Sequence, residues 1–443
     1  MSKHRSADEK GRSSTALRVG LFGRLCSGNI GNDVSMESVL AYLRTDHPDI
    51  ILDAMCNGPE QIASRYGIDA TELFYLHAFN RRPSRPVRAA WLLPEKCADA
   101  VRIAAWVRRH DVVIVPGMGV LEATLPVSPW ELPYSLYLLA VCGRLFRTKV
   151  ALVSVGASPI KQRTTRWLLN QAAKLAYYRS YRDNESREAM TQRGLNTSRD
   201  PVYPDLAFSI AVPPYNPGSP RTVGIGVMRY FGGPDDRHHS SEMHANYVHN
   251  VKLFASWLVD NDYSVRLFFG DEDDESVARD IAAELKSNRP GLAQPAVVVE
   301  QVSTFDQLTR AMQSVAIVVA TRFHNVICAV RLAKPTISIG YAVKNAAILA
   351  DAGLADFCLP AQSLDADQII ERFKELEGRS PERRRMQESA AAKALLLDEQ
   401  FALLSARLFP SATSSTTALR RQRETASYEE PAASGCGLLR EQS

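Results

Sequence analysis

The fold is decided by the stretch VAIVVATRFHN, which runs from Val315 to Asn325. Its first six residues are small or β-branched and apolar, which predicts a strand buried on both faces, as in a parallel sheet. Beyond it, Val326 to Leu332 has the pattern of a short apolar helix. Arg322 and His324 therefore fall in the loop after a buried strand, where open α/β sheets bind their ligands.

A guanidinium and an imidazole two residues apart suit an anionic substrate that also needs a proton moved. Taken alone, the same pair also fits an arginine that caps a neighbouring helix and a histidine packed at the sheet margin. The residues by themselves leave both interpretations open.

The composition is that of a globular protein with two domains. The chain has 443 residues, of which 45% are hydrophobic and 23% charged. A net charge of +4 is too small over this length to indicate nucleic-acid binding. Seven scattered cysteines without a C-x-x-C pair predict reduced thiols and a cytoplasmic protein. No signal peptide is apparent at the N-terminus.

The longest apolar stretch, Leu132 to Phe146, is interrupted by polar residues and is too short to span a bilayer. A buried helix is the favoured interpretation of this stretch. Peripheral membrane association remains open.

Residues 17–212 alternate strands and helices, which predicts a doubly wound parallel sheet, after a disordered leader at 1–16. The first strand leads into a glycine-bearing turn with Asn29 and Asp33 and then a helix, a typical anion-binding corner. A second glycine-bearing loop, with Gly117, follows another strand.

Four prolines in residues 213–220 predict an interdomain linker that is neither helix nor central strand. The pattern restarts over 221–362, with Arg229 at the end of the first strand and Lys344 beyond the last. Residues 363–410 have helical patterns and 411–443 resemble a disordered tail. The predicted fold class is α/β, with two Rossmann-like doubly wound domains facing across a cleft.

Three polar segments receive structural rather than functional interpretations. The acidic segment Gly270–Glu275 is interpreted as a solvated loop that caps a helix from Ser276, in preference to a cation site. Residues 81–88 are interpreted as a solvated arginine-rich loop. His238, His239, His244 and His249 lack the regular spacing of zinc ligands.

Several motifs in order resemble the polysaccharide pyruvyl transferase family, from near Val19 to about Leu354. They are the segments GNIGND (28–33), DVVIVPGMG (111–119), YRDNES (181–186), PDLAF (204–208) and TRFHN (321–325), followed by Pro335 and YAVK (341–344). The chain departs from the family at the loops PGMG and GASP, which have fewer glycines, and at Asn325, where glycine is common. These departures concern the acceptor more than the donor.

The resemblance implies a fold like that of GT-B glycosyltransferases and transfer of an enolpyruvyl unit from phosphoenolpyruvate to a sugar diol. It implies that His324, Arg322 and Arg229 hold phosphoenolpyruvate, and it requires no cofactor or metal. The chemistry agrees, because two guanidiniums can clamp a carboxylate and a phosphate, and an imidazole can move the protons.

Further candidate substrate-binding residues follow from position in the chain. Lys344 is a candidate for phosphate contact, and Asn29, Asp33 and Gly117 are candidates on the acceptor side. The acceptor is expected to be a sugar or a lipid-linked oligosaccharide in exopolysaccharide or cell-surface glycan synthesis. Two alternatives remain: a nucleotide-sugar glycosyltransferase on the same frame, and a non-catalytic sugar- or anion-binding relative.

Overall fold

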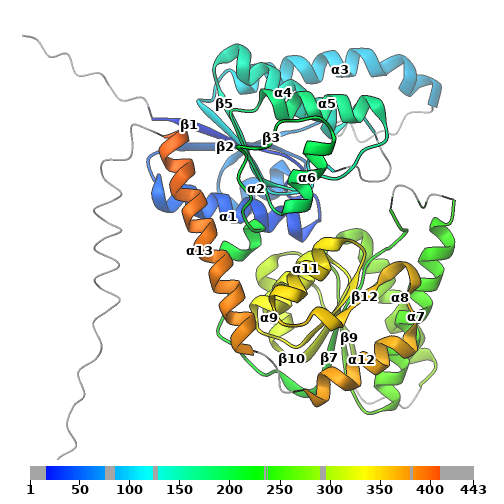
Figure 1. The fold of residues 1–443 in the computed structure, drawn as a ribbon. Helices are drawn as coiled ribbons and strands as arrows, with labels where there is room; N and C mark the ends of the chain where they lie inside the picture. The colour runs from blue at the N-terminus through cyan, green and yellow to red at the C-terminus, as the bar shows by residue number, and fades with distance from the viewer. Residues whose placement is uncertain are drawn as a thin grey trace, which may run out of the picture.

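The computed structural model describes residues 16–74, 85–122, 128–233, 236, 238–289, 296–379 and 383–409. It has two lobes, one above the other in Figure 1. The expected leader, the tail and residues 81–84 of the arginine-rich segment lie outside the described residues. Residues 85–88 of that segment belong to a helix, so the prediction of a loop is wrong there.

The N-terminal lobe consists of β1 (Arg18–Phe22), α1 (Ile30–Asp46), β2 (Ile51–Cys56), α2 (Pro59–Tyr66), β3 (Asp69–Glu72), α3 (Arg85–Val107), β4 (Val112–Pro116), α4 (Leu132–Phe146), β5 (Lys149–Val155), α5 (Arg163–Leu175), β6 (Tyr178–Tyr181), α6 (Asn184–Gln192) and the 3-10 turn η2 (Leu206–Ser209).

The C-terminal lobe consists of β7 (Ser219–Gly226), α7 (Ser240–Asp260), β8 (Ser264–Phe268), the 3-10 turn η3 (Glu272–Asp274), α8 (Glu275–Ser287), β9 (Val297–Val299), α9 (Phe305–Gln313), β10 (Val315–Ala320), α10 (Phe323–Arg331), β11 (Thr336–Gly340), α11 (Val343–Asp351), the 3-10 turn η4 (Ala355–Phe357), β12 (Cys358–Pro360), the 3-10 turn η5 (Ala361–Ser363) and α12 (Ala366–Gly378), and it is followed by α13 (Arg383–Leu408).

Each lobe contains one parallel six-stranded sheet. The strand orders are β3-β2-β1-β4-β5-β6 and β12-β11-β10-β7-β8-β9. The central strands are buried on both faces because helices cover both sides of each sheet. The predicted fold class is therefore confirmed. The crossover points lie at β1/β4 and at β7/β10, where α/β folds bind ligands.

The proline-rich segment 213–220 leads directly into the second sheet. Strand β7 begins at Ser219, so the last two residues of the segment belong to a central strand, contrary to expectation. Pro220 is tolerated because β7 pairs irregularly with β10 at this end, where the register shifts between Val315 and Ile317.

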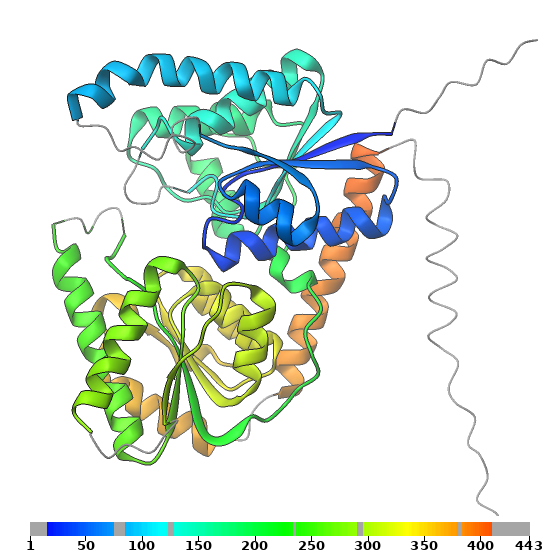
Figure 2. The same ribbon diagram turned by 180° about the vertical axis from the view of Figure 1, so that it is seen from behind.

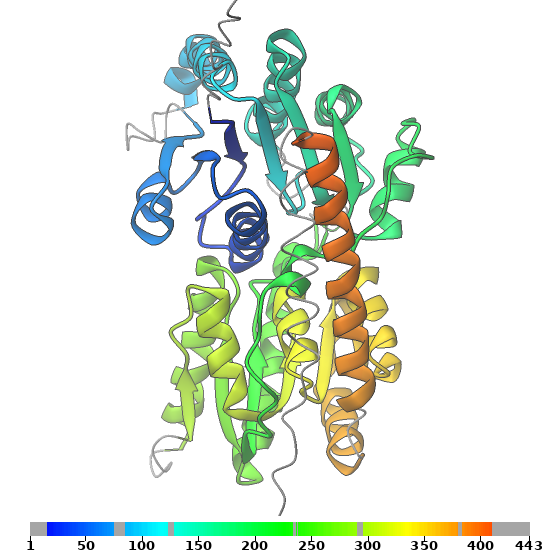
Figure 3. The ribbon, with the colours of Figure 1, turned by 90° about the vertical axis from the view of Figure 1, so that its left-hand side faces the viewer.

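The final helix, α13, runs alongside both lobes (Figure 3). In its first half, Lys393 Nζ lies 2.6 Å from Asp351 Oδ2 of the C-terminal lobe. Near its end, Gln400 accepts a hydrogen bond from Ser154 of the N-terminal lobe at 2.9 Å, and Phe401 stacks on Tyr42 with ring centroids 4.6 Å apart. The chain thus returns to the lobe in which it began.

Candidate functional site

The carboxyl ends of β7 and β10 meet around the buried carboxylate of Asp274. Arg322, at the N-cap of α10, donates from Nε and Nη2 to the two oxygens of Asp274, at 2.7 and 2.8 Å. The backbone N–H of Arg229 donates to Oδ1 of the same carboxylate at 2.8 Å. The two predicted arginines therefore lie on adjacent strand ends joined by one side chain.

The two guanidinium groups have different surroundings. Burial lowers the pKa of Arg322, but the hydrogen bonds to Asp274 outweigh it and raise the pKa, so the side chain stays cationic. The Arg229 guanidinium is exposed and lies over the ring of Phe231, 5.2 Å from its centroid. No carboxylate pairs with it within the described part of the chain. The site thus holds one paired and one unpaired cation.

The acidic segment before α8 is the expected solvated loop only in part. Glu272 and Asp273 are exposed, but Asp274 is fully buried, and Asp271 accepts a 2.7 Å hydrogen bond from Nδ2 of Asn29 in the other lobe. The helix begins at Glu275, one residue before the predicted Ser276. The prediction is wrong for Asp274, because a run of carboxylates gives no sign of which one turns toward the sheet.

His324 lies in the first turn of α10 and faces the N-terminal lobe. Its Nε2 is 3.6 Å from Oδ2 of Asp205, whose Oδ1 accepts the backbone N–H of Ala207 at 3.0 Å. Burial alone would raise the pKa of Asp205, but His324 and Arg182 outweigh it and lower the pKa to about 2. An ionised carboxylate from one lobe therefore faces the imidazole of the other.

Gly31, in the first turn of α1, leaves the space that the imidazole occupies. A Cβ at this position would lie 2.1 Å from Nδ1 of His324. We expect Gly31→Ala to displace His324 or separate the lobes and to lower turnover by about 10-fold or more, because His324 is the predicted acid/base and small misplacements of a reacting group are costly. The measurement is kcat, and Gly378→Ala, whose Cβ would meet nothing within 4 Å, is the matched control. Equal turnover in the two variants would contradict the close approach.

Lys344 belongs to a second group of charges across the lobes. Its Nζ lies 3.9 Å from Oε1 of Glu122, which also pairs with Arg182. Burial would raise the pKa of Glu122, but Lys344 and Arg182 outweigh it and the net shift is downward. The Lys344 ammonium also lies 4.9 Å from the ring centroid of Phe323. Lys344, the residue predicted to contact phosphate, therefore lies beside the first turn of α10.

The predicted acceptor-side residues have well-defined partners. Asn29 caps α1 through Oδ1, which accepts the N–H of Gly31 at 3.0 Å, while its amide binds Asp271. Gly117 has φ +50°, and a Cβ there would lie 2.6 Å from Ser35 Oγ, so it allows the β4 loop to approach α1. Asp33 is 4% exposed, and its Oδ1 accepts the N–H of Cys26 at 2.7 Å. These three residues lie at the start of α1 and beside it.

Burial raises the pKa of Asp33 from 3.8 to about 6, against the opposing hydrogen bond from Cys26. Because the folded-state pKa lies above the unfolded one, the free energy of unfolding falls as pH rises from about 4 through about 6. We expect Asp33→Asn, which keeps the acceptor, to stabilise the protein by about 3 kcal/mol at pH 8 and by about half as much at pH 5. Urea denaturation at both pH values measures this, with the exposed Asp69→Asn as control. A gain that does not change with pH would contradict the prediction.

Asn325, one of the departures from the family pattern, is fully buried behind Arg322. Its amide lies between the ends of β7 and β8, where a Cβ on Gly226 would be 2.7 Å from Nδ2 and one on Gly270 would be 3.1 Å from Oδ1. Neither amide atom has a hydrogen-bond partner among the described residues. A side chain thus fills the crevice that glycine would leave open.

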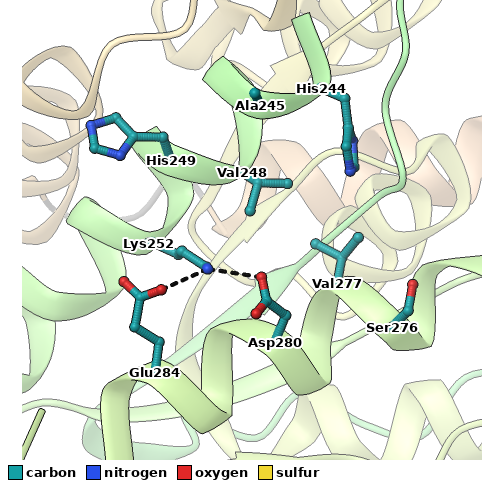
Figure 4. Close-up of a pocket in the computed structure, with 9 residues that line it drawn as sticks. All are labelled: His244, Ala245, Val248, His249, Lys252, Ser276, Val277, Asp280 and Glu284. Carbon is teal, nitrogen blue, oxygen red and sulfur yellow. Dashed lines mark hydrogen bonds and ion pairs between the residues drawn. The ribbon is translucent and has the colours of Figure 1, made fainter. Parts of the chain in front are cut away.

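A separate groove of about 420 Å³ lies between α7 and α8 (Figure 4). Lys252 crosses it and pairs with Asp280 and Glu284, at 2.8 and 2.6 Å. His244 and His249 line its rim, but the described residues contain no group of three or more His, Cys, Asp or Glu side chains placed to hold a metal ion. None of the predicted site residues lines this groove.

The sequence analysis predicted no role for four charged residues of the site, namely Asp274, Asp205, Arg182 and Glu122. Arg182 and Asp205 stand in the motifs YRDNES and PDLAF, so their position in those motifs was the available signal. Glu122 follows the PGMG loop by three residues, and nothing in its own surroundings marks it. Their partners come from other strands and the other lobe, which a linear pattern does not show.

Comparison with solved structures identifies the fold. The chain is similar to a putative UDP-N-acetylglucosamine 2-epimerase from Listeria monocytogenes, with 10% identity, a TM-score of 0.59, and coverage of 90% of this chain and 98% of the other. A UDP-GlcNAc 2-epimerase from Neisseria meningitidis bound to UDP-GlcNAc gives 11% identity, a TM-score of 0.52, and coverage of 87% and 100%. A lipopolysaccharide outer core galactosyltransferase gives 11% identity, a TM-score of 0.51, and coverage of 88% and 99%.

These likenesses show a GT-B-like fold. No curated protein matches the sequence. The sequence pattern of one family, described as polysaccharide pyruvyl transferase, matches residues 29–342, which include every predicted site residue except Lys344. This match covers well over half of the chain and supports a transferase that acts on polysaccharides. The chain belongs to the polysaccharide pyruvyl transferase family.

Proposed function

We propose that this protein transfers the enolpyruvyl unit of phosphoenolpyruvate to a sugar diol, which gives a cyclic pyruvate ketal and inorganic phosphate. The observation that carries the proposal is the pair Arg229 and Arg322, which share Asp274 at adjacent strand ends beside the start of α10. The acceptor would be a sugar or lipid-linked oligosaccharide in exopolysaccharide or cell-surface glycan synthesis.

The donor's two anionic groups have suitable partners at this edge of the sheet. Arg229 is unpaired with carboxylates among the described residues, and Arg322 uses only Nε and Nη2 for Asp274, which leaves Nη1 for a ligand. The first N–H groups of α10 have no partner within the helix and attract anions. Phosphate and carboxylate would then be held by side-chain cations and backbone, without a cofactor or metal.

His324 would move the protons. It protonates the methylene carbon of phosphoenolpyruvate, one sugar hydroxyl attacks C2, phosphate leaves with its oxygen, and the second hydroxyl attacks the same carbon. One hydroxyl proton balances the proton given to the methylene, and the other leaves on phosphate. Asp205, ionised and 3.6 Å from Nε2, orients the imidazole. Because Asp205 and His324 belong to different lobes, the acid/base pair depends on the contact between the lobes in this structure.

The test is phosphate release from phosphoenolpyruvate with a panel of sugar acceptors, together with the mass of the product. A pyruvate ketal formed in equal amount with phosphate supports the proposal. Release of a nucleoside diphosphate from a nucleotide sugar, with no use of phosphoenolpyruvate, would show a glycosyltransferase instead. Binding of sugar or phosphoenolpyruvate without turnover by any acceptor would show a non-catalytic relative.

A further inference from the structure

The solvent-facing side of α3 is apolar where a surface helix normally carries polar residues. Leu93, Cys97, Val101 and Ala105 follow one another at intervals of four, so they share one side of the helix. All four are exposed, Leu93 to 74% and Val101 to 70%. Among the described residues of the whole chain, these are two of the most exposed large apolar side chains.

Helices α4 and α5 extend this apolar surface. Leu145 near the end of α4 is 70% exposed, and Trp167 on α5 is 52% exposed. Trp167 contacts Tyr137 of α4, with ring centroids 5.2 Å apart. On the other side of α4, the hydroxyl of Tyr134 donates to the carbonyl of Lys96 on α3 at 3.2 Å. The three helices therefore form one layer on the outer side of the N-terminal lobe, away from the C-terminal lobe (Figure 1).

Helices α4 and α5 carry positive charge and no carboxylate of their own. Neither α4 nor α5 contains an acidic residue. The described acidic residues of α3, Glu95 and Asp99, both pair with Lys96, at 3.0 and 2.6 Å, and Asp99 is fully buried. Glu131, at the N-cap of α4, pairs with Arg24 at 3.1 Å. The basic residues on and beside α4 and α5 include Arg144, Arg147, Arg163, Arg166 and Lys174.

We propose that this α3–α5 face docks on the surface of an anionic lipid bilayer. Exposed aliphatic side chains and a tryptophan beside arginines suit the boundary between head groups and acyl chains. None of the helices within the described residues is long and apolar enough to cross a membrane, so the contact is with one surface. A second copy of the chain fits less well. A two-fold contact with its axis across the helices would bring the basic α5 faces of both copies together, and one with its axis along the helices would bury the α5 arginines against apolar α3.

Docking through this face would hold the N-terminal lobe at the membrane, where a lipid-carried acceptor would enter. This consequence, unlike the docking itself, rests on the proposed function.

The docking test uses the full chain and co-sedimentation with vesicles of phosphatidylcholine, with and without phosphatidylglycerol. We expect binding only with phosphatidylglycerol, weakened by salt. Leu145→Glu with Trp167→Glu should weaken it by about tenfold or more.

The matched control is Leu395→Glu, which alters a residue of α13 that is 65% exposed. This variant should bind vesicles as well as the unmodified chain does. Leu93→Glu with Val101→Glu provides a second variant on α3 if the first fails to fold, as judged by thermal melting. Failure of the unmodified chain to bind anionic vesicles would overturn the proposal. The proposal would also be overturned if Leu395→Glu and both double variants bound anionic vesicles equally well. It would fail too if the unmodified chain formed a dimer that the double variants dissociate, without binding vesicles.

Phosphate release by the same variants distinguishes a failure of the docking proposal from a failure of the proposed enzyme reaction. With a water-soluble acceptor, the α3–α5 variants should release phosphate at the unmodified rate, because none of the changed residues lies at the proposed site. If phosphoenolpyruvate proves not to be the donor, vesicle binding still tests the docking face independently.

Discussion

Replacing His324 with glutamine is expected to lower kcat for phosphate release by about 10²- to 10⁴-fold, the usual contribution of a positioned acid/base. The KM for phosphoenolpyruvate should change little, because the cations Arg229 and Arg322 remain. Glutamine fills similar space and keeps polar atoms near Asp205, so folding should be retained. Steady-state kinetics over a range of phosphoenolpyruvate concentrations gives both quantities.

The matched control is His249→Gln, in the groove between α7 and α8, which none of the predicted site residues lines. It should leave both constants unchanged. Near-normal turnover in His324→Gln would remove the acid/base assignment, and a raised KM with unchanged kcat would make His324 a binding residue only.

Arg322→Ala is expected to abolish measurable turnover and also to destabilise the fold by about 3–5 kcal/mol, because it leaves the buried Asp274 carboxylate without its cation. Asp274 is fully buried, whereas Arg322 has 21% of its side chain exposed, so the penalty falls mainly on the carboxylate. Urea denaturation measures the stability, and phosphate release measures the activity.

A double variant separates the two effects. In Arg322→Gln with Asp274→Asn the buried charge is gone, and the new asparagine amide would still offer an oxygen to the N–H of Arg229. We expect most of the stability to return while activity stays lost. Recovered activity in the double variant would show that Arg322 serves the fold alone, and a stable Arg322→Ala would contradict the buried pairing.

Much of the fold follows from local pattern. The β10 segment Val315–Ala320 predicts a buried strand because six small or β-branched apolar residues in succession are typical of a sheet covered on both faces. The alternation of such strands with helices then fixes parallel sheets, and Arg322 and His324 fall at a strand end as a consequence. The path of α13 was not predictable, because a helical pattern shows which side is apolar but not which lobe that side contacts.

The candidate site was predictable only in part, for a physical reason. Arg229, Arg322 and His324 each follow a strand and stand out as isolated polar groups. Asp274 lies among other carboxylates, and its role depends on which oxygen meets a guanidinium 48 positions away. Pairing across lobes, as between His324 and Asp205, depends on the angle at which the lobes meet, which no segment of sequence specifies.

The return of α13 to the first lobe has a consequence for biosynthesis. Tyr42 and His47, near the end of α1, bond or stack with Ser405, Phe401 and Phe409, which are made hundreds of residues later. The N-terminal lobe, which is made before α13, is therefore left with an uncovered flank until α13 has been synthesised. A nascent chain stopped before α13 should remain open to protease at that flank, and neither half should be obtainable as an independent fragment of full stability.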